Sequence, residues 1–126
     1  MIMTIIKICF FGLLFVSCNQ SEKAIDVFSE KEVNIGTVSL SDTVHFDVEI
    51  TNPMDEDLVI KNAASSCGCS LVSIKDSVVK PNQTTKLEIE FIPKLSGSSG
   101  STEKAIVIET NSKQRFHELL IKANIE

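Results

Sequence analysis

Apolar and polar residues alternate along most of the chain after residue 23, which is the pattern of β-strands that bury one face. The clearest examples are the ranges 44–50, 86–91 and 119–125, in which every second residue is apolar. Shorter stretches of the same kind predict further strands at 24–28, 33–38, 57–62, 69–74 and 104–110. No segment keeps the 3.6-residue period of an amphipathic helix. We therefore predict an all-β fold.

Turn-forming residues separate these stretches. Asn52-Pro53 follows one predicted strand, Pro81-Asn82 precedes another, and the polar run 95–102 predicts a flexible loop between two more. Strands that recur about every 8–14 residues predict an antiparallel β-sandwich. The pair of distant cysteines around a buried Trp, typical of antibody domains, is absent. The prediction is thus a sandwich of about seven strands, immunoglobulin-like in shape, in one domain over residues 24–126.

The first 17 residues have the features of an export signal. Lys7 supplies a positive charge, and the apolar run 8–16 is shorter than the roughly 20 residues that a membrane span needs. The run ends next to Cys18 in a sequence that resembles a bacterial lipobox, and the chain then becomes polar. We expect a lipoprotein signal peptide at 1–17, an acylated Cys18 and a short tether over residues 18–23.

Acylation of Cys18 would anchor the protein in the bacterial cell envelope, with its domain in the periplasm or at the cell surface. Each CH₂ of a palmitate-like chain buried in the bilayer contributes about 0.8 kcal/mol. The alternative is plain secretion with cleavage near Ser17. Cys9 lies in the signal, so lipid on Cys18 would leave Cys67 and Cys69 as a pair in an oxidising compartment, where a disulfide persists.

Composition excludes several classes of partner. The chain has 12 basic and 17 acidic residues and a net charge of −5, whereas nucleic-acid binding needs clustered Lys and Arg. It has no Trp and no Tyr, so aromatic platforms for single strands are missing. A polybasic membrane patch is also missing. We expect no nucleic-acid partner.

The motif Cys67-Gly68-Cys69 is the main candidate for chemistry. On an extended strand its two Cα atoms would lie about 7 Å apart, at the limit for a disulfide, and we expect Gly68 to let the chain curl. The bridge would close a very small loop and so stabilise the fold little. Three interpretations stay open: a pair that shapes a turn, a thiol–disulfide centre, and a metal site that suits Cu(I) better than zinc.

The motif, extended to Ser66-Cys67-Gly68-Cys69-Ser70, resembles that of the bacterial family of unknown function DUF1573, which carries Ser-Cys-Gly-Cys-Thr. The resemblance covers residues 28–126 and includes the strand before the Asn52 turn and Lys80-Pro81 before another strand. Ser70 stands where the family usually has Thr. The resemblance implies an immunoglobulin-like sandwich related to modules that mostly mediate interactions, and it implies no known reaction.

The remaining residues provide little for catalysis. A zinc site would need His45 and His117 to converge on the cysteines. We expect instead that His45 is exposed on its strand and that His117 is a partly buried, hydrogen-bonded residue. The chain lacks a Gly-x-Ser-x-Gly elbow and a glycine-rich phosphate loop. We therefore expect no enzyme and no cofactor, but a lipid-anchored interaction module for an envelope protein. The rival function is thiol redox or Cu(I) binding at Cys67 and Cys69.

Overall fold

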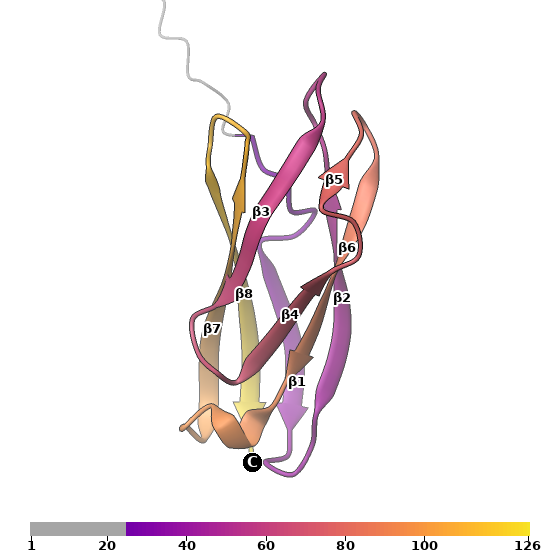
Figure 1. Ribbon diagram of the computed structural model, residues 1–126. Coiled ribbons are helices and arrows are strands. Elements are labelled where there is room, and N and C mark those ends of the chain that lie inside the picture. The colour runs from indigo at the N-terminus through magenta and orange to yellow at the C-terminus, as the bar shows by residue number, and fades with distance from the viewer. Residues whose placement is uncertain (1–24) are drawn as a thin grey trace, which may run out of the picture.

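The computed structural model describes residues 25–126, which form two β-sheets stacked face to face (Figure 1). One sheet has five strands in the order β1-β8-β7-β3-β5, and the other has three in the order β2-β6-β4. The strands are β1 (Glu32–Val38), β2 (Val44–Thr51), β3 (Leu58–Ser65), β4 (Ser70–Ile74), β5 (Val78–Val79), β6 (Thr84–Phe91), β7 (Gly100–Thr110) and β8 (Phe116–Ile125). A short 3₁₀-helix, η1 (Pro93–Leu95), follows β6. This part of the chain contains no helix long and apolar enough to cross a bilayer.

The predicted β-sandwich is confirmed, with some differences in detail. Residues 25–28 form only an isolated bridge between Phe28 and Ile50, and β5 has two residues, too few to show alternation. The predicted loop 95–102 is shorter, because η1 occupies its start and β7 begins at Gly100. One strand pair also departs from the antiparallel prediction, since β1 runs parallel to β8.

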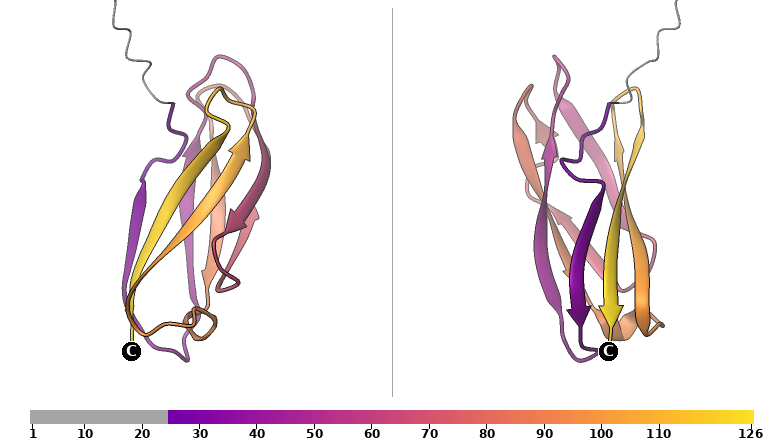
Figure 2. Two further views of the ribbon diagram at one scale, coloured as in Figure 1. Left: turned by 90° about the vertical axis from the view of Figure 1, so that its left-hand side faces the viewer. Right: turned by 180° about the vertical axis from the view of Figure 1, so that it is seen from behind.

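The parallel pair arises because the chain changes sheets near its described start. The segment around Phe28 lies beside β2, with hydrogen bonds from Ser29 N to Glu49 O at 3.3 Å and from Thr51 N to Val27 O at 2.8 Å. The chain then crosses to the other sheet, where β1 lies beside β8 (Figure 2). The first strand thereby closes one side of the sandwich.

The core lies between the sheets, on the apolar side of each alternating strand. From β6, Leu87, Ile89 and Phe91 point inward and are at most 2% exposed. They face residues of the larger sheet such as Ile106 and Leu119, which are fully buried. Burying each side chain of this size contributes about 1.5–3 kcal/mol. The intervening polar residues of β6 face solvent, as the alternation predicts.

Asn52 is a buried polar residue at one end of the sandwich. It joins the end of β2 to the following turn, to β5 and to the turn before β6. Its side chain is fully buried, and its Nδ2 donates to Glu56 O at 2.7 Å and to Val79 O at 2.8 Å. Its Oδ1 accepts from Met54 N at 2.9 Å. Its backbone N–H donates to Gln83 O at 3.0 Å. Asn52 thus holds the end of β2 against β5 and the turn before β6.

His117 is the second notable polar residue of the interior. It is 1% exposed, and its Nε2 lies 3.1 Å from Ser112 Oγ and 3.4 Å from Thr110 Oγ1. Burial lowers the pKa of His117 below its usual value of 6.5, because the imidazolium loses hydration. The charge of Asp26 and a backbone hydrogen bond with Gln114 act in the opposite direction and offset only part of this shift.

Replacing Asn52 with Ala should lower the free energy of unfolding by about 3 kcal/mol, because its buried side chain makes three hydrogen bonds, each worth about 1 kcal/mol. The matched control is Asn124→Ala on the exposed side of β8, which should change it by less than about 0.5 kcal/mol. Urea unfolding of both variants checks this. Equal effects at the two positions would refute the role assigned to Asn52.

The stability of the protein should fall as pH is lowered through 6.5 toward the lower pKa of folded His117. Above this window both the folded and the unfolded states hold a neutral ring, and within it the unfolded state binds the proton more readily. Urea unfolding between about pH 8 and pH 5 measures the slope. His117→Gln should flatten it, whereas His45→Gln, at an exposed site, should not. An unchanged slope in His117→Gln would contradict the assignment.

Candidate functional site

The Cys67-Gly68-Cys69 motif lies in the short connection between β3 of one sheet and β4 of the other. A disulfide joins Cys67 to Cys69, and their Cα atoms are 5.2 Å apart. The connection therefore curls, as the motif predicts, instead of continuing as an extended strand. The motif marks the point where the chain passes between the sheets.

Hydrogen bonds hold this connection against both sheets. Ser66 N donates to Ala105 O at 2.8 Å, and Ala105 N donates to Ser66 Oγ at 3.0 Å, which fixes the start of the connection to β7. Ile92 N donates to Cys69 O at 2.7 Å, which fixes its end beside β6. The connection is therefore anchored at both ends, once to each sheet.

The backbone conformation at Gly68 does not require glycine. Its φ lies outside the left-handed region that favours glycine, and an added Cβ would meet no atom within 4 Å. The conformation and the surroundings at this position therefore accept other residues. The disulfide and the two anchoring hydrogen-bond sets hold the curl, and the expected contribution of Gly68 to its formation stays a prediction.

The two cysteines differ in their access to solvent. Cys69 is fully buried in a cluster with Phe91 and Ile125, whereas Cys67 is half-buried and packs against that cluster. An attacking thiolate could approach only the Cys67 sulfur, and Cu(I) would need the bridge to be reduced first. A buried cysteine such as Cys69 is typical of a structural pair and not of a reactive one.

The structure does not bring the two histidines to the cysteines. His45 is exposed on β2 in the three-stranded sheet, as predicted, whereas His117 is buried on β8 in the other sheet, more deeply than predicted. Among residues 25–126, no group of three or more His, Cys, Asp or Glu side chains could hold a metal ion. The condition for a zinc site is therefore not met in this region.

Ser112 and His117 lie close enough to raise the question of a catalytic pair. Ser112 Oγ is buried and donates to Gln114 O at 2.7 Å, so its proton is already committed. The same Oγ lies 3.1 Å from Nε2 of His117 and 2.8 Å from Thr110 Oγ1, so the ring contacts a hydroxyl that has other partners. We interpret the pair as part of the polar network that stabilises the β7–β8 turn.

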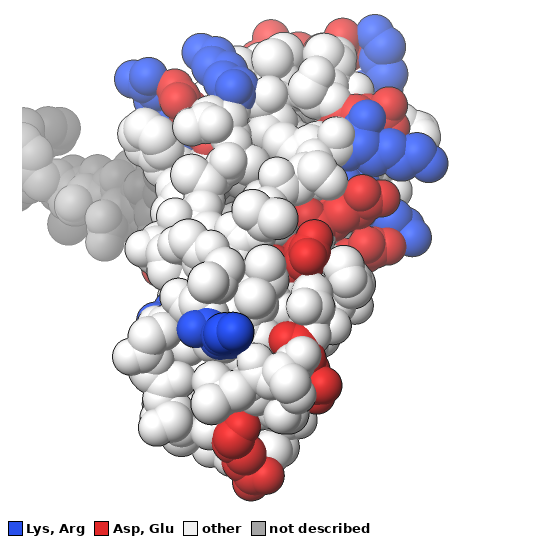
Figure 3. Space-filling view, turned by 60° about the horizontal axis from the view of Figure 1, so that its bottom comes forward, with Lys and Arg blue, Asp and Glu red and all other residues white. Residues whose placement is uncertain are grey.

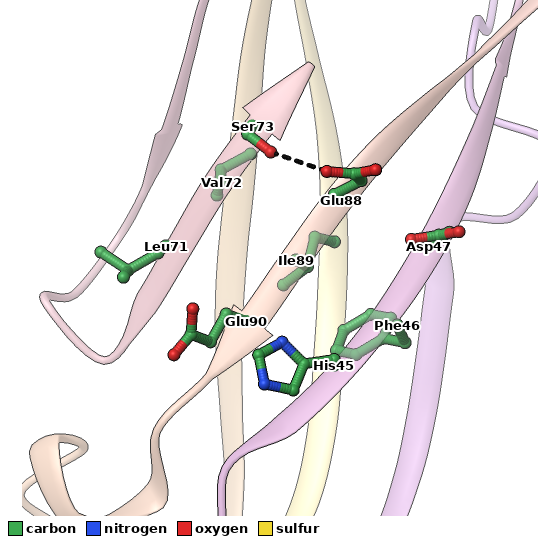
Figure 4. A pocket seen from close by; sticks show the side chains of 9 residues that line it. All are labelled: His45, Phe46, Asp47, Leu71, Val72, Ser73, Glu88, Ile89 and Glu90. Carbon is green, nitrogen blue, oxygen red and sulfur yellow. Dashed lines mark hydrogen bonds between the residues drawn. The ribbon is translucent and has the colours of Figure 1, made fainter. Parts of the chain in front are cut away.

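The outward side of the three-stranded sheet is a surface that the sequence reasoning did not single out. It is hollowed into a shallow depression of about 350 Å³ that runs across β2, β6 and β4 (Figure 4). We call this surface the outer face; its residues are His45, Asp47, Glu49, Leu71, Ser73, Lys86, Glu88 and Glu90. These residues occupy the outward-facing alternate positions of three strands, and this alternation was the sequence signal that could have predicted the outer face.

The outer face is acidic around one apolar residue. Four of its side chains are carboxylates, and Lys86 lies 3.4 Å from one of them, Asp47. Ser73 Oγ donates to Glu88 at 3.2 Å, and His45 lies opposite Glu90 in the sheet. Leu71 is 57% exposed. In the tilted view of Figure 3, acidic side chains lie together with basic ones on the side where β2 and β6 lie in Figure 1.

The predicted export signal at 1–17, the acylation site Cys18 and the tether over residues 18–23 lie outside the described residues. They stay predictions from the sequence.

Solved structures show what the sandwich is similar to. A protein of unknown function from Porphyromonas gingivalis W83 is 20% identical, with a TM-score of 0.67, over 75% of this chain and 44% of that one. The PapD-like domain 7 of human CEP192 is 12% identical, with a TM-score of 0.58, over 79% and 83%. The CupB2 chaperone of Pseudomonas aeruginosa is 12% identical, with a TM-score of 0.56, over 79% and 55%.

These likenesses establish a PapD-like, immunoglobulin-like fold and nothing more specific. The chain spans less than half of the Porphyromonas protein. Proteases and a glycoside hydrolase also match, but the chain covers at most 32% of each, so the likeness leaves most of those enzymes out. No curated protein matches the sequence.

The sequence of residues 27–125 matches a family described as "Protein of unknown function (DUF1573)", which agrees with the resemblance seen in the cysteine motif. This match covers most of the chain and all of its named strands. The chain therefore belongs to the DUF1573 family.

Proposed function

We propose that this protein is a non-catalytic interaction module that binds another protein of the bacterial cell envelope, to which an acylated Cys18 anchors it. The observation that carries the proposal is the outer face, which exposes Leu71 among carboxylates on the three-stranded sheet. A hollowed surface with an apolar residue inside a polar rim fits the anatomy of a protein contact. The chain shares its PapD-like fold with the CupB2 chaperone, and this likeness supports this class of function.

The anchoring part of the proposal rests on the sequence. The apolar run 8–16 followed by Cys18 supports export and acylation, and the polar residues 19–23 would separate the domain from the bilayer. The domain would then work in the periplasm or at the cell surface, close to the membrane.

The rival proposal, thiol redox or Cu(I) binding at Cys67 and Cys69, has weaker support. Both chemistries need accessible sulfur atoms, and only Cys67 is partly accessible, because Cys69 is fully buried and packed against Phe91. The two proposals differ in what the cysteines do, so they can be separated by experiment.

Mass spectrometry of the protein purified from its native membrane should find a diacyl or triacyl mass on Cys18. Digestion with trapped thiols should find Cys67 and Cys69 joined and slow to reduce, since one sulfur is buried. Unmodified Cys18 at a free N-terminus would refute the anchor. A bound metal or a readily reduced bridge would support the rival.

Chemical crosslinking in the native envelope, followed by purification, should capture a protein partner in a saturable manner. Cys69→Ser should lower the free energy of unfolding by about 1–3 kcal/mol, as for other core substitutions, yet still capture the partner at a temperature where it is folded. Gly68→Ala is the control within the motif and should change neither property.

The opposite pattern would favour the rival, namely lost activity or metal binding in Cys69→Ser with unchanged stability. If no envelope protein is captured in a saturable manner, the proposed function is wrong.

A further inference from the structure

We propose that the free edge of β4 binds an extended strand of the partner, apolar on its inward side and basic on its outward side. This inference rests on the proposed function and states where and how the module binds. It is carried by the main-chain geometry of β4, by a comparison of all the sheet edges, and by the charge of the outer face. Strand addition of this kind lets main-chain hydrogen bonds supply affinity and side chains supply specificity.

The hydrogen bonds around β4 show which of its residues face the open edge. Cys69 O accepts from Ile92 N, and Lys75 N donates to Lys86 O, so both point toward β6. Leu71 and Ser73 have the same parity and pair with β6 in register. In an antiparallel ladder, the residues between them direct their main-chain groups to the other side. The main-chain N–H and C=O of Val72 and Ile74 therefore face away from β6, where the sheet ends.

The other sheet edges have features that hinder pairing with another strand, and β4 lacks these features. β1 has an irregular register between Asn34 and Thr37, with Gly36 at φ +74°. β5 has two residues, and β3 has a register shift next to Lys61. Bulges, short length and charges on the strand are the usual protections of an edge.

The remaining edge, β2, is protected by the rest of the chain. The segment 27–29 covers its end, and the uncovered part carries His45 and Asp47 at its outward positions. By contrast, the residues of β4 from Ser70 to Ile74 include no charge, proline or glycine and show no register shift along β6. Among the described strands, β4 thus has the edge best suited to pairing.

The surroundings of β4 define the chemistry of the added strand. On the inward side, Val72 and Ile74 are half-buried against the core, so a strand beside them needs apolar residues there. On the outward side it would lie next to Leu71 and Ser73, about 10 Å from β6. A Lys or Arg side chain extended toward β6 and a glutamate side chain extended toward it together cover that distance, which places a cation opposite Glu88 or Glu90 on the acidic rim.

The same charges argue against a second copy of this chain as the occupant. Two β4 strands placed edge to edge would bring two acidic outer faces side by side, and each chain carries a net charge of −5. Like charges across an interface oppose association. A basic strand from a different protein is the complementary occupant.

The test uses a capped peptide of eight residues in which lysine and valine alternate, with a glutamate–valine peptide as its charge control. Hydrogen exchange of the full-length protein is followed by NMR. The amides of Val72 and Ile74 should exchange fast in the free protein and become protected with the lysine peptide. The amides of Leu71 and Ser73, already paired with β6, should be protected throughout and serve as the reference.

Binding should be weaker with the glutamate peptide and should weaken as salt rises from about 50 mM to about 500 mM, which shortens the Debye length roughly threefold. Leu71→Lys should reduce affinity about tenfold, because it adds a cation at the edge. The matched control is Leu40→Lys, the same change at an exposed leucine in the turn between β1 and β2. Both sites are exposed, so both variants should keep the wild-type circular dichroism.

Several results would overturn the inference: no binding of the lysine peptide, protection at other amides only, or equal loss in the two leucine variants. None of these would refute the proposed function, because the crosslinking experiment detects a partner on any surface. If crosslinking captures a partner equally with wild type and Leu71→Lys, the module binds elsewhere. If it captures none, the proposed function itself fails.

Discussion

The alternation along β6 is the constraint on which both faces of the molecule depend. Leu87, Ile89 and Phe91 must lie against the larger sheet to exclude water, and the pleat of a strand then directs Glu88 and Glu90 outward. A register slip of one residue would bury carboxylates and expose the core, so the pairing of β6 with β2 and β4 is strongly specified. The acidic outer face is thus a direct consequence of how the core forms.

Most of the fold could be predicted because period-two alternation is a local signal. The parts that could not be predicted depend on distant contacts. The parallel pairing of β1 with β8 follows from the bridge of Phe28 to β2, which no local pattern encodes. The depth of His117 depends on Thr110 and Ser112 across the β7–β8 turn, whose hydroxyls contact Nε2 of a ring whose position at a strand start predicts only partial burial.

The candidate site shows the same division between local and distant information. The cysteine motif is visible in the sequence, and a curl there could be expected from the glycine between Cys67 and Cys69. The burial of Cys69 could not, because it depends on Phe91 and Ile125, which are far along the chain. The outer face was also hidden, since Leu71 becomes significant only when β4 is known to lie at a sheet edge.

The motif and the β4 edge are connected through the fold, which favours a positional role for the cysteines. The chain passes from β3 to β4 within the connection that holds the disulfide, fixed to β7 at Ser66 and to the end of β6 at Cys69. Because Cys69 is buried beside Phe91, the first residue of β4 has little freedom to move. A strand that adds to a preorganised edge loses less conformational entropy on binding. The cysteine pair would then serve binding by holding β4 in place, without taking part in chemistry.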